Sequence, residues 1–543
     1  MWHFILVLVI LVQSVMALGS YTPYKTKCPS GPLLRQGGNI SSSEAEYIAS
    51  KQQKSNVALK DFLEKVAIPG LDVEQYMSSR DRTSNLALGF SGGGYRSMIV
   101  SAGVVKAFDA RNEGSNTLGG LLQSINYMSS ASGGSWMLGT LAMNNFPQVS
   151  EIQNNGKLWN LNNNVAKLLN PLSWTVIGDY GKVITKVVGK RMAGYRVSLT
   201  DEFGMVVGEE LADSDYSTFS QIAQSQAYTN HDLPFPVCLV TALQAGDVPS
   251  SDIKISNPIL EATPLEFGSF DKQINMFMSM GQIGSQMENG QVQGDCTGGF
   301  DQSSFFMGAT ASLFNSAKSW SKAGLKLVGL ANGNQQPSAI FYPNPFKGLS
   351  DVEAPYNGMA LYGADGAYSG MGLPLWPMVQ PSRKVDMFFC LDADGAPPGD
   401  TPDGKTLRNL ADKVTEEMGP GVFPEVPSPE EYQQKFLEKP LWMGCDVSKL
   451  KQIPGSDRYV PLIVEVPNHE VSYNSLVKTM KLDYSKEEIN GIVQNGFDIA
   501  TMSNSTEWAQ CIGCSVVLRE FQRQNKTLPD VCQKCLSDYC YRS

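Results

Sequence analysis

The sequence predicts an α/β fold, in which buried strands pass through small-residue turns into helices. Asn85–Phe90 is an apolar run followed by Ser91–Arg96, which holds three consecutive glycines, and a helical pattern begins at Ser97. Ile125–Met128 is a second short strand candidate, and Ser129–Gly134 leads from it into another apolar helical pattern. Because such turns join the end of a strand to the start of a helix, we expect a sheet with flanking helices.

The second turn contains a candidate nucleophile, Ser132. A serine between small residues at a strand-to-helix turn is typical of a nucleophile elbow, whose tight bend exposes the hydroxyl to a substrate carbonyl. The G-x-S-x-G pattern is incomplete, because Ser130 stands where the first glycine is expected.

The first turn favours an anion. Three consecutive glycines, Gly92–Gly94, would let backbone N–H groups point into a concavity at the predicted helix N-terminus, which suits a phosphate or the oxyanion of acyl transfer. No Gly-Lys-Ser/Thr follows and G-x-G-x-x-G is absent, which argues against a nucleotide-binding loop. Further along, Leu361–Tyr368 places Asp365 before a glycine at the end of a short apolar run.

Together these motifs resemble the fungal phospholipase B (lysophospholipase) family, which is related to the cytosolic phospholipase A-type and patatin-like hydrolases. The resemblance covers nearly all of the chain. The segments that carry it are Gly89–Arg96, Ser132–Trp136, Thr263–Asp271, Gly299–Asp301, Ala364–Gly366, Pro374–Pro377 and a terminal cysteine cluster.

The resemblance implies a central mixed sheet flanked by helices, with insertions, and a serine–aspartate dyad. In that mechanism Ser132 is the nucleophile, Asp365 is the base, Gly93 and Gly94 donate to the oxyanion, and Arg96 lies near the substrate phosphate. An ion pair within the fold is the alternative role for Arg96. The family chemistry is hydrolysis of fatty-acyl esters through an acyl-serine, with acyl transfer to a second lysolipid open to the same intermediate.

The histidine content favours the dyad over a Ser-His-Asp triad. Outside the first residues the chain has only His231 and His469, and both follow polar turn sequences. We therefore expect Asp365, partly desolvated, to take the proton of Ser132. The sequence has no set of metal ligands and no calcium-binding loop, so no metal or other cofactor is expected.

Met1–Ala17 is expected to be a secretory signal, because Phe4–Val12 is an apolar core too short to span a bilayer and Val15–Ala17 offers a cleavage site. Residues 18–543 are then expected to form a single catalytic domain. No other stretch reaches the length of a membrane helix and no apolar tail for a lipid anchor follows Tyr539, so an exported protein is expected. Sequons at Asn39, Asn504 and Asn525 are candidate glycosylation sites.

Ten cysteines in an exported chain predict disulfides, with a cysteine-rich segment at about 505–543. The spacing of Cys511, Cys514, Cys532 and Cys535 also fits a zinc ribbon. The exported context and the additional thiol of Cys540 favour disulfides.

The formal net charge of −10, without a basic run, argues against nucleic acid and against attraction to anionic bilayers. Zwitterionic phospholipids and lysophospholipids, at a membrane or micelle surface, are the expected partners. A patatin-like acyl hydrolase of other lipids and an inactive lipid-binding homologue are the alternatives.

Overall fold

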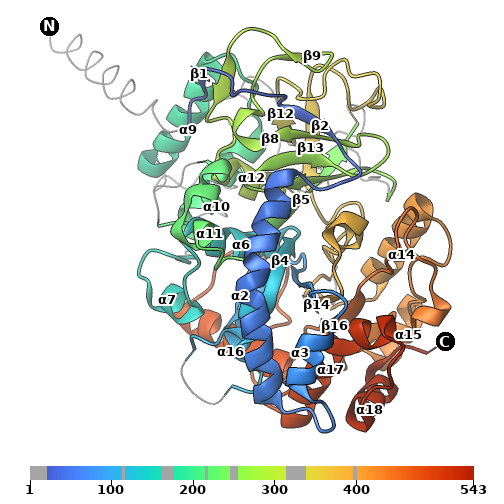
Figure 1. Ribbon diagram of the computed structural model, residues 1–543. Coiled ribbons are helices and arrows are strands. Elements are labelled where there is room, and N and C mark those ends of the chain that lie inside the picture. The colour runs from blue at the N-terminus through green and yellow to red at the C-terminus, as the bar shows by residue number, and fades with distance from the viewer. Residues whose placement is uncertain are drawn as a thin grey trace, which may run out of the picture. The chain divides into compact units, whose positions relative to one another are not determined.

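The computed structural model describes residues 21–112, 116–161, 177–213, 218–244, 255–312, 338–395 and 400–542 (Figure 1). The predicted signal peptide, Met1–Ala17, lies outside these residues. The chain divides into two compact units, each assembled from three stretches. The first unit comprises Met1–Gly37, Asn160–Gln224 and Val240–Asp365, and the second comprises Gly38–Trp159, Ser225–Leu239 and Gly366–Ser543.

A mixed sheet forms the centre of the second unit, as predicted. Its strands lie in the order β15 (Leu441–Met443), β16 (Leu462–Pro467), β14 (Met387–Asp392), β3 (Leu86–Phe90), β4 (Ile125–Ser130) and the first half of β5 (Phe235–Leu243). All neighbours are parallel except β15, which runs antiparallel to β16. Strands covered on both faces by helices are apolar throughout, which explains the continuous hydrophobic runs in the sequence.

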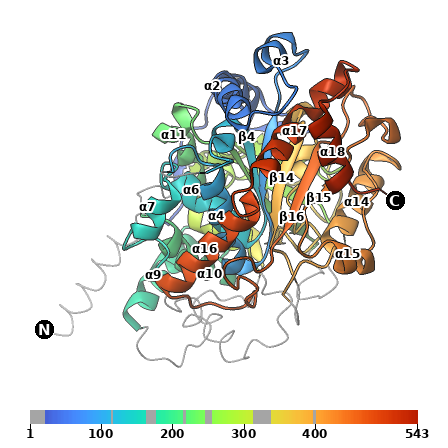
Figure 2. The same cartoon turned by 90° about the horizontal axis from the view of Figure 1, so that it is seen from below.

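Helices cover this sheet. Figure 2 shows α16 (Lys486–Thr501) beside α4 (Gly94–Phe108), and α17 (Thr506–Arg523) beside β14 and β16. The α4–α16 crossing is close because it is built on glycines. A Cβ at Gly496 would lie 2.1 Å from the carbonyl oxygen of Val100, so a larger residue would force the helices apart. The remaining helices of this unit are α2 (Ser42–Val66), α3 (Val73–Ser79), α5 (Leu121–Ser124), α6 (Gly133–Met143), α7 (Val149–Asn154), α11 (Gln226–Thr229), α14 (Lys405–Met418), α15 (Pro429–Lys435) and α18 (Asp530–Tyr539).

Helix α2, drawn in blue in Figure 1, begins where its capping sequence indicates. The side chain of Ser41 accepts a hydrogen bond from the backbone N–H of Glu44 at 3.2 Å. The carboxylate of Glu44 does not complete a capping box, because it pairs with the buried Arg383 at 2.8 Å and accepts from the hydroxyl of Tyr127 at 3.1 Å. These contacts tie the start of α2 to the sheet.

The first unit has its own antiparallel strands, paired in the order β6 (Ile259–Ala262), β7 (Glu266–Ser269), β8 (Met276–Ser279) and β2 (Leu34–Gln36). Strand β13 (Leu361–Asp365) lies antiparallel between β12 (Ala339–Phe341) and the second half of β5. Helix α10 (Leu199–Leu211) packs on α12 (Ser303–Ala309). Among the described residues of this unit are also α9 (Ile177–Met192), β1 (Tyr24–Thr26), β9 (Met287–Glu288), β10 (Gln291–Val292) and β11 (Cys296–Gly298).

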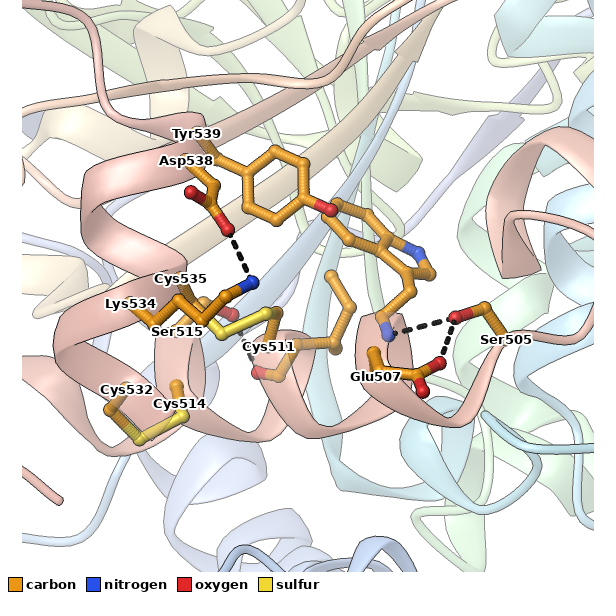
Figure 3. Close-up of a disulfide and its surroundings, with 12 residues drawn as sticks. Ser505, Glu507, Cys511, Cys514, Ser515, Cys532, Lys534, Cys535, Asp538 and Tyr539 are labelled. Atoms are coloured by element: carbon orange, nitrogen blue, oxygen red, sulfur yellow. Dashed lines mark hydrogen bonds and ion pairs between the residues drawn. A yellow bond between two sulfur atoms is a disulfide. The ribbon is translucent and has the colours of Figure 1, made fainter. Parts of the chain in front are cut away.

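The terminal cysteines form disulfides, so the zinc-ribbon interpretation is wrong. Cys511 pairs with Cys535 and Cys514 with Cys532, which staples α17 to α18 (Figure 3). In a fold of this kind both pairings are geometrically direct, because cysteines three apart on α17 face those three apart on α18. Further disulfides join Cys445 to Cys540 in the second unit and Cys28 to Cys296 in the first. Cys238 and Cys390 are buried thiols.

Candidate active site

Ser132 lies at the turn between β4 and α6, and the predicted strand-to-helix turn is confirmed. Its backbone has φ 51° and ψ −129°, a left-handed value that is rare for a residue with a Cβ. Strain of this kind persists where the surrounding structure enforces it, and a nucleophile elbow is one such place. The residue is 4% exposed, so only a substrate that enters the fold would reach its hydroxyl.

Ser130, which replaces the first glycine of the elbow pattern, is accommodated without distortion. It is the last residue of β4, and its hydroxyl donates to the hydroxyl of Ser135 at 3.0 Å. The same hydroxyl lies 3.4 Å from the sulfur of Cys238 on β5. A small side chain therefore fits between the turn and the neighbouring strand, where a glycine would leave these groups without this contact.

The glycine-rich turn begins helix α4 three residues earlier than the sequence pattern indicates, at Gly94 instead of Ser97. Both Gly93, with φ 129°, and Gly94, with φ 63°, have positive φ values that glycine adopts at little cost. A Cβ at Gly93 would lie 2.5 Å from the carbonyl oxygen of Ala393, and one at Gly94 would lie 2.6 Å from that of Thr479. Glycine is required at both positions by conformation and by space.

The two turns lie directly against each other. A Cβ at Gly133, the first residue of α6, would lie 2.0 Å from the carbonyl oxygen of Gly94. A Cβ at Gly92 would lie 3.5 Å from the Cβ of Ser132. The structure therefore brings Ser132 next to the backbone predicted to donate to the oxyanion. Two helices, α4 and α6, also begin here, and the partial positive charge of their N-termini favours a developing negative charge.

Asp365 ends strand β13 in the first unit, where it faces Val240 of β5 in the register and is fully buried. The chain that follows it belongs to the second unit and runs beside the glycine-rich turn. A Cβ at Gly92 would lie 3.4 Å from the Cβ of Ala367, two residues after Asp365. The role of Asp365 as the base for Ser132 stays a prediction.

Arg96 is fully buried on the first turn of α4. Its guanidinium donates to the carbonyl oxygens of Val477 at 2.6 Å and Ala393 at 2.8 Å, and it lies 3.5 Å from a carboxylate oxygen of Asp400. The alternative ion-pair role is therefore present. Its Nε donor is buried and has no acceptor among the described residues. The contact with a substrate phosphate stays a prediction.

Both histidines outside the predicted signal peptide have other contacts. The ring of His231 packs on Tyr47 with centroids 5.0 Å apart, and Nδ1 of His469 lies 2.9 Å from the carbonyl oxygen of Pro467. Within the described part of the chain, neither ring is hydrogen-bonded to a serine or an aspartate. These contacts are consistent with a reaction that uses no histidine.

A further carboxylate, that of Asp394, borders the glycine-rich turn, and the sequence analysis missed it. Asp394 has an oxygen 3.3 Å from the position of a Cβ at Gly92 and accepts from the hydroxyl of Thr406 at 2.9 Å. Burial raises the pKa of Asp394, and burial together with Asp394 raises that of Asp392. The signal was present in the sequence, because the Asp-x-Asp pattern directly follows a buried parallel strand, where sites of α/β proteins lie.

The predicted glycosylation sites differ in exposure. Asn39 and Asn525 are exposed, whereas Asn504 is half-buried and its side-chain oxygen accepts from the backbone N–H of Thr117 at 2.8 Å. Glycosylation at each stays a prediction. Among the described residues no cluster of histidine, cysteine, aspartate or glutamate side chains has the geometry to hold a metal ion.

Comparison with known proteins places these features in a family. The sequence model of the lysophospholipase catalytic domain matches residues 86–543. The lysophospholipase of Torulaspora delbrueckii is 32% identical over 561 residues, which cover 96% of this chain and 85% of that protein. Lysophospholipase 1 of Candida albicans is 32% identical over 569 residues, which cover 99% of this chain and 92% of that protein.

Among solved structures, human GIVD cytosolic phospholipase A2 matches with a TM-score of 0.66 at 15% identity, covering 91% of this chain and 67% of that one. A likeness at this identity shows the fold alone, and it agrees with the mixed sheet and flanking helices. With the fold of cytosolic phospholipase A2 and a family match over most of its length, this chain belongs to the lysophospholipase (phospholipase B) family of hydrolases.

Proposed function

We propose that the protein is a secreted phospholipase B that hydrolyses the fatty-acyl esters of lysophospholipids and phospholipids through an acyl-serine on Ser132. The observation that carries this proposal is the left-handed backbone of Ser132, held at the strand-to-helix turn and packed against Gly92–Gly94. A strained serine beside a glycine turn and two helix N-termini is suited to attack an ester carbonyl.

The reaction would proceed in two steps. Ser132 Oγ attacks the ester carbonyl carbon while its proton passes to the carboxylate of Asp365. The backbone N–H groups of Gly93 and Gly94 stabilise the oxyanion, and the leaving alcohol then takes the proton from Asp365. In the second step water attacks the acyl carbon while Asp365 takes a proton from the water, and this proton passes to Ser132 Oγ as the acyl–Oγ bond breaks and the fatty acid leaves. When the hydroxyl of a second lysolipid attacks instead of water, the product is a diacyl phospholipid, which is the transacylase reaction.

Two alternatives remain distinct from this proposal. An acyl hydrolase of galactolipids or neutral lipids would use the same serine but would gain nothing from Arg96. An inactive lipid-binding homologue would need no strained serine, so the elbow conformation favours an enzyme. The curated relatives are named lysophospholipases, which supports a phospholipid substrate.

Secretion, Met1–Ala17 as its signal and glycosylation at the exposed sequons are part of the proposal. Disulfides are typical of proteins that fold in an oxidising compartment, and both units contain them. No helix among the described residues has the length and apolar character needed to cross a membrane.

Labelling with a fluorophosphonate, followed by mass spectrometry of the peptides, tests the nucleophile. We expect the phosphonyl group on Ser132, and we expect Ser132→Ala to abolish both labelling and hydrolysis of lysophosphatidylcholine. Ser135→Ala is the matched control, because this buried serine lies in the same turn region and should keep the labelling. Modification of another serine, or full activity of Ser132→Ala, would overturn the assignment.

A further inference from the structure

A second charged site lies at the opposite end of the sheet strands in the second unit. Four arginines, Arg82, Arg458, Arg519 and Arg523, line a pocket of about 280 Å³, which we call the arginine pocket. Arg82 precedes β3, Arg458 precedes β16, and Arg519 and Arg523 lie on α17. The catalytic turns follow the carboxyl ends of β3 and β4, whereas this pocket borders the amino ends of the strands. The two sites are therefore separated by roughly the length of a strand, on the order of 17 Å.

Arg519 is the central feature of the pocket because its charge is buried and no ion pair joins it to a carboxylate of the described residues. The side chain is 5% exposed. It donates to the carbonyl oxygens of Gly444 at 2.9 Å and Val460 at 3.0 Å, and to the amide oxygen of Gln522 at 2.8 Å. Its Nε has no acceptor, and no ion pair joins it to any carboxylate of the described chain. A buried cation in this state is costly unless an anion approaches it.

The neighbouring charges do not neutralise the pocket. Asp386 is shared by two arginines, at 2.6 Å from Arg523 and 3.1 Å from Arg458. Arg523 also pairs with Glu520 at 2.6 Å, and Arg82 pairs with Asp457 near the exposed mouth. Four guanidinium groups thus face three carboxylates, in a protein whose formal net charge is −10.

The excess of arginines over carboxylates around the pocket changes the pKa of Arg519. Burial lowers the pKa of Arg519 to about 10, and repulsion by Arg523 and Arg458 acts in the same direction, although Asp386 opposes it. A bound anion would remove both the desolvation cost and the repulsion. Guanidinium groups bind tetrahedral oxyanions through paired N–H donors, so a phosphate group fits this donor set.

We propose that the arginine pocket binds a phosphate group, either as inorganic phosphate or as the phosphomonoester of a small organic molecule. The phosphate oxygens accept from the guanidinium groups of Arg519, Arg458 and Arg82, which line the pocket. Bound there, the ligand joins the segments that precede β3 and β16 to helix α17. The proposal is independent of the proposed hydrolysis, because no residue of the pocket belongs to the catalytic turns.

Isothermal titration calorimetry of the full-length protein, at neutral pH in phosphate-free buffer, tests the site with inorganic phosphate. We expect saturable binding at one site per chain, and a thermal unfolding temperature that rises with phosphate but not with chloride at the same ionic strength. Tighter binding of glycerol 3-phosphate would assign the site to an organic phosphomonoester, and equal or weaker binding would assign it to inorganic phosphate. Absence of saturable binding by both would overturn the proposal.

Two variants locate the binding. Arg519→Gln should weaken it about tenfold to a hundredfold, since one charge-assisted contact is lost. If Arg519→Gln does not fold, Arg82→Gln decides the question, because Arg82 is 36% exposed in a surface ion pair of small energetic value. Arg111→Gln is the matched control, since Arg111 has the same exposure and also pairs with an aspartate, but lies outside the pocket. Equal affinity of Arg82→Gln and Arg111→Gln proteins would overturn the proposal.

Discussion

Substitution of Gly133 by alanine offers a direct test of how the catalytic turns depend on each other. The Cβ of the new residue would lie 2.0 Å from the carbonyl oxygen of Gly94, whereas real Cβ contacts are not closer than 3.0 Å. The two backbones must therefore separate by 1.0 Å or more. That displacement moves the N–H groups of Gly93 and Gly94 away from the oxyanion that the proposed reaction forms at Ser132.

The expected cost is catalytic. A misplacement of this size costs about a hundredfold in rate, which corresponds to about 2.7 kcal/mol of transition-state stabilisation. Alanine is also a better helix former than glycine, so the start of α6 itself is not weakened by the change. Steady-state hydrolysis of lysophosphatidylcholine should show the loss mainly in kcat, while circular dichroism remains that of the parent protein.

Two controls separate local displacement from general damage. Gly156→Ala should leave kcat unchanged, because no atom of the described residues lies within 4 Å of the added Cβ. Gly496→Ala introduces a clash of similar size, 2.1 Å from the carbonyl oxygen of Val100, but between α4 and α16. A kcat of Gly133→Ala within about twofold of the parent value would refute the reasoning. It would also be refuted if Gly133→Ala and Gly496→Ala lost the same activity and each loss matched a fall in the unfolding temperature of that variant.

Three further predictions concern the base, the phosphate contact and a buried lysine. Asp365→Asn should lower kcat about a hundredfold to ten-thousandfold, whereas the double variant His231→Gln, His469→Gln should keep most of its activity. An active Asp365→Asn protein together with an inactive double variant would establish a Ser-His-Asp triad. Arg96→Leu should reduce hydrolysis of lysophosphatidylcholine about tenfold to a hundredfold more than that of a neutral nitrophenyl ester, and equal losses would restrict Arg96 to its contacts within the fold. Burial lowers the pKa of the Lys51 ammonium from 10.5 to about 7. Between these two pH values the unfolded chain therefore binds one more proton than the folded protein, and the free energy of unfolding rises with pH. Urea unfolding should show this rise, about 1.4 kcal/mol per pH unit, in the parent protein but not in Lys51→Met. The prediction would be contradicted if the free energy of unfolding changed with pH in the same way in both proteins.

Some local structure was less predictable than the turns. Val57 follows the apolar spacing of α2, yet it is 63% exposed, because the helix contacts the sheet along a narrower stripe than the hydrophobic pattern indicates. Pro461 lies directly before β16, and a proline within a strand is expected only at an edge or a bulge. The strand instead begins at Leu462, after the proline, and pairs on both sides, with β14 and β15. Proline excludes only the residue that must donate, and β16 begins beyond it.

The sequence alone determined the two strand–turn–helix segments, since a tight bend needs small residues at particular positions and leaves that record in a few consecutive letters. The choice of disulfides over zinc was equally local, because an even number of cysteines in a chain with a predicted secretory signal indicates disulfides. Only the tertiary structure decided that Gly133 lies against Gly94, that Ser130 is satisfied by Ser135, and that Arg519 is buried without a carboxylate. These facts depend on which parallel strands are neighbours and on how closely helices approach them. Contacts between residues far apart in the chain are set by packing of the whole core, which no short stretch of sequence encodes.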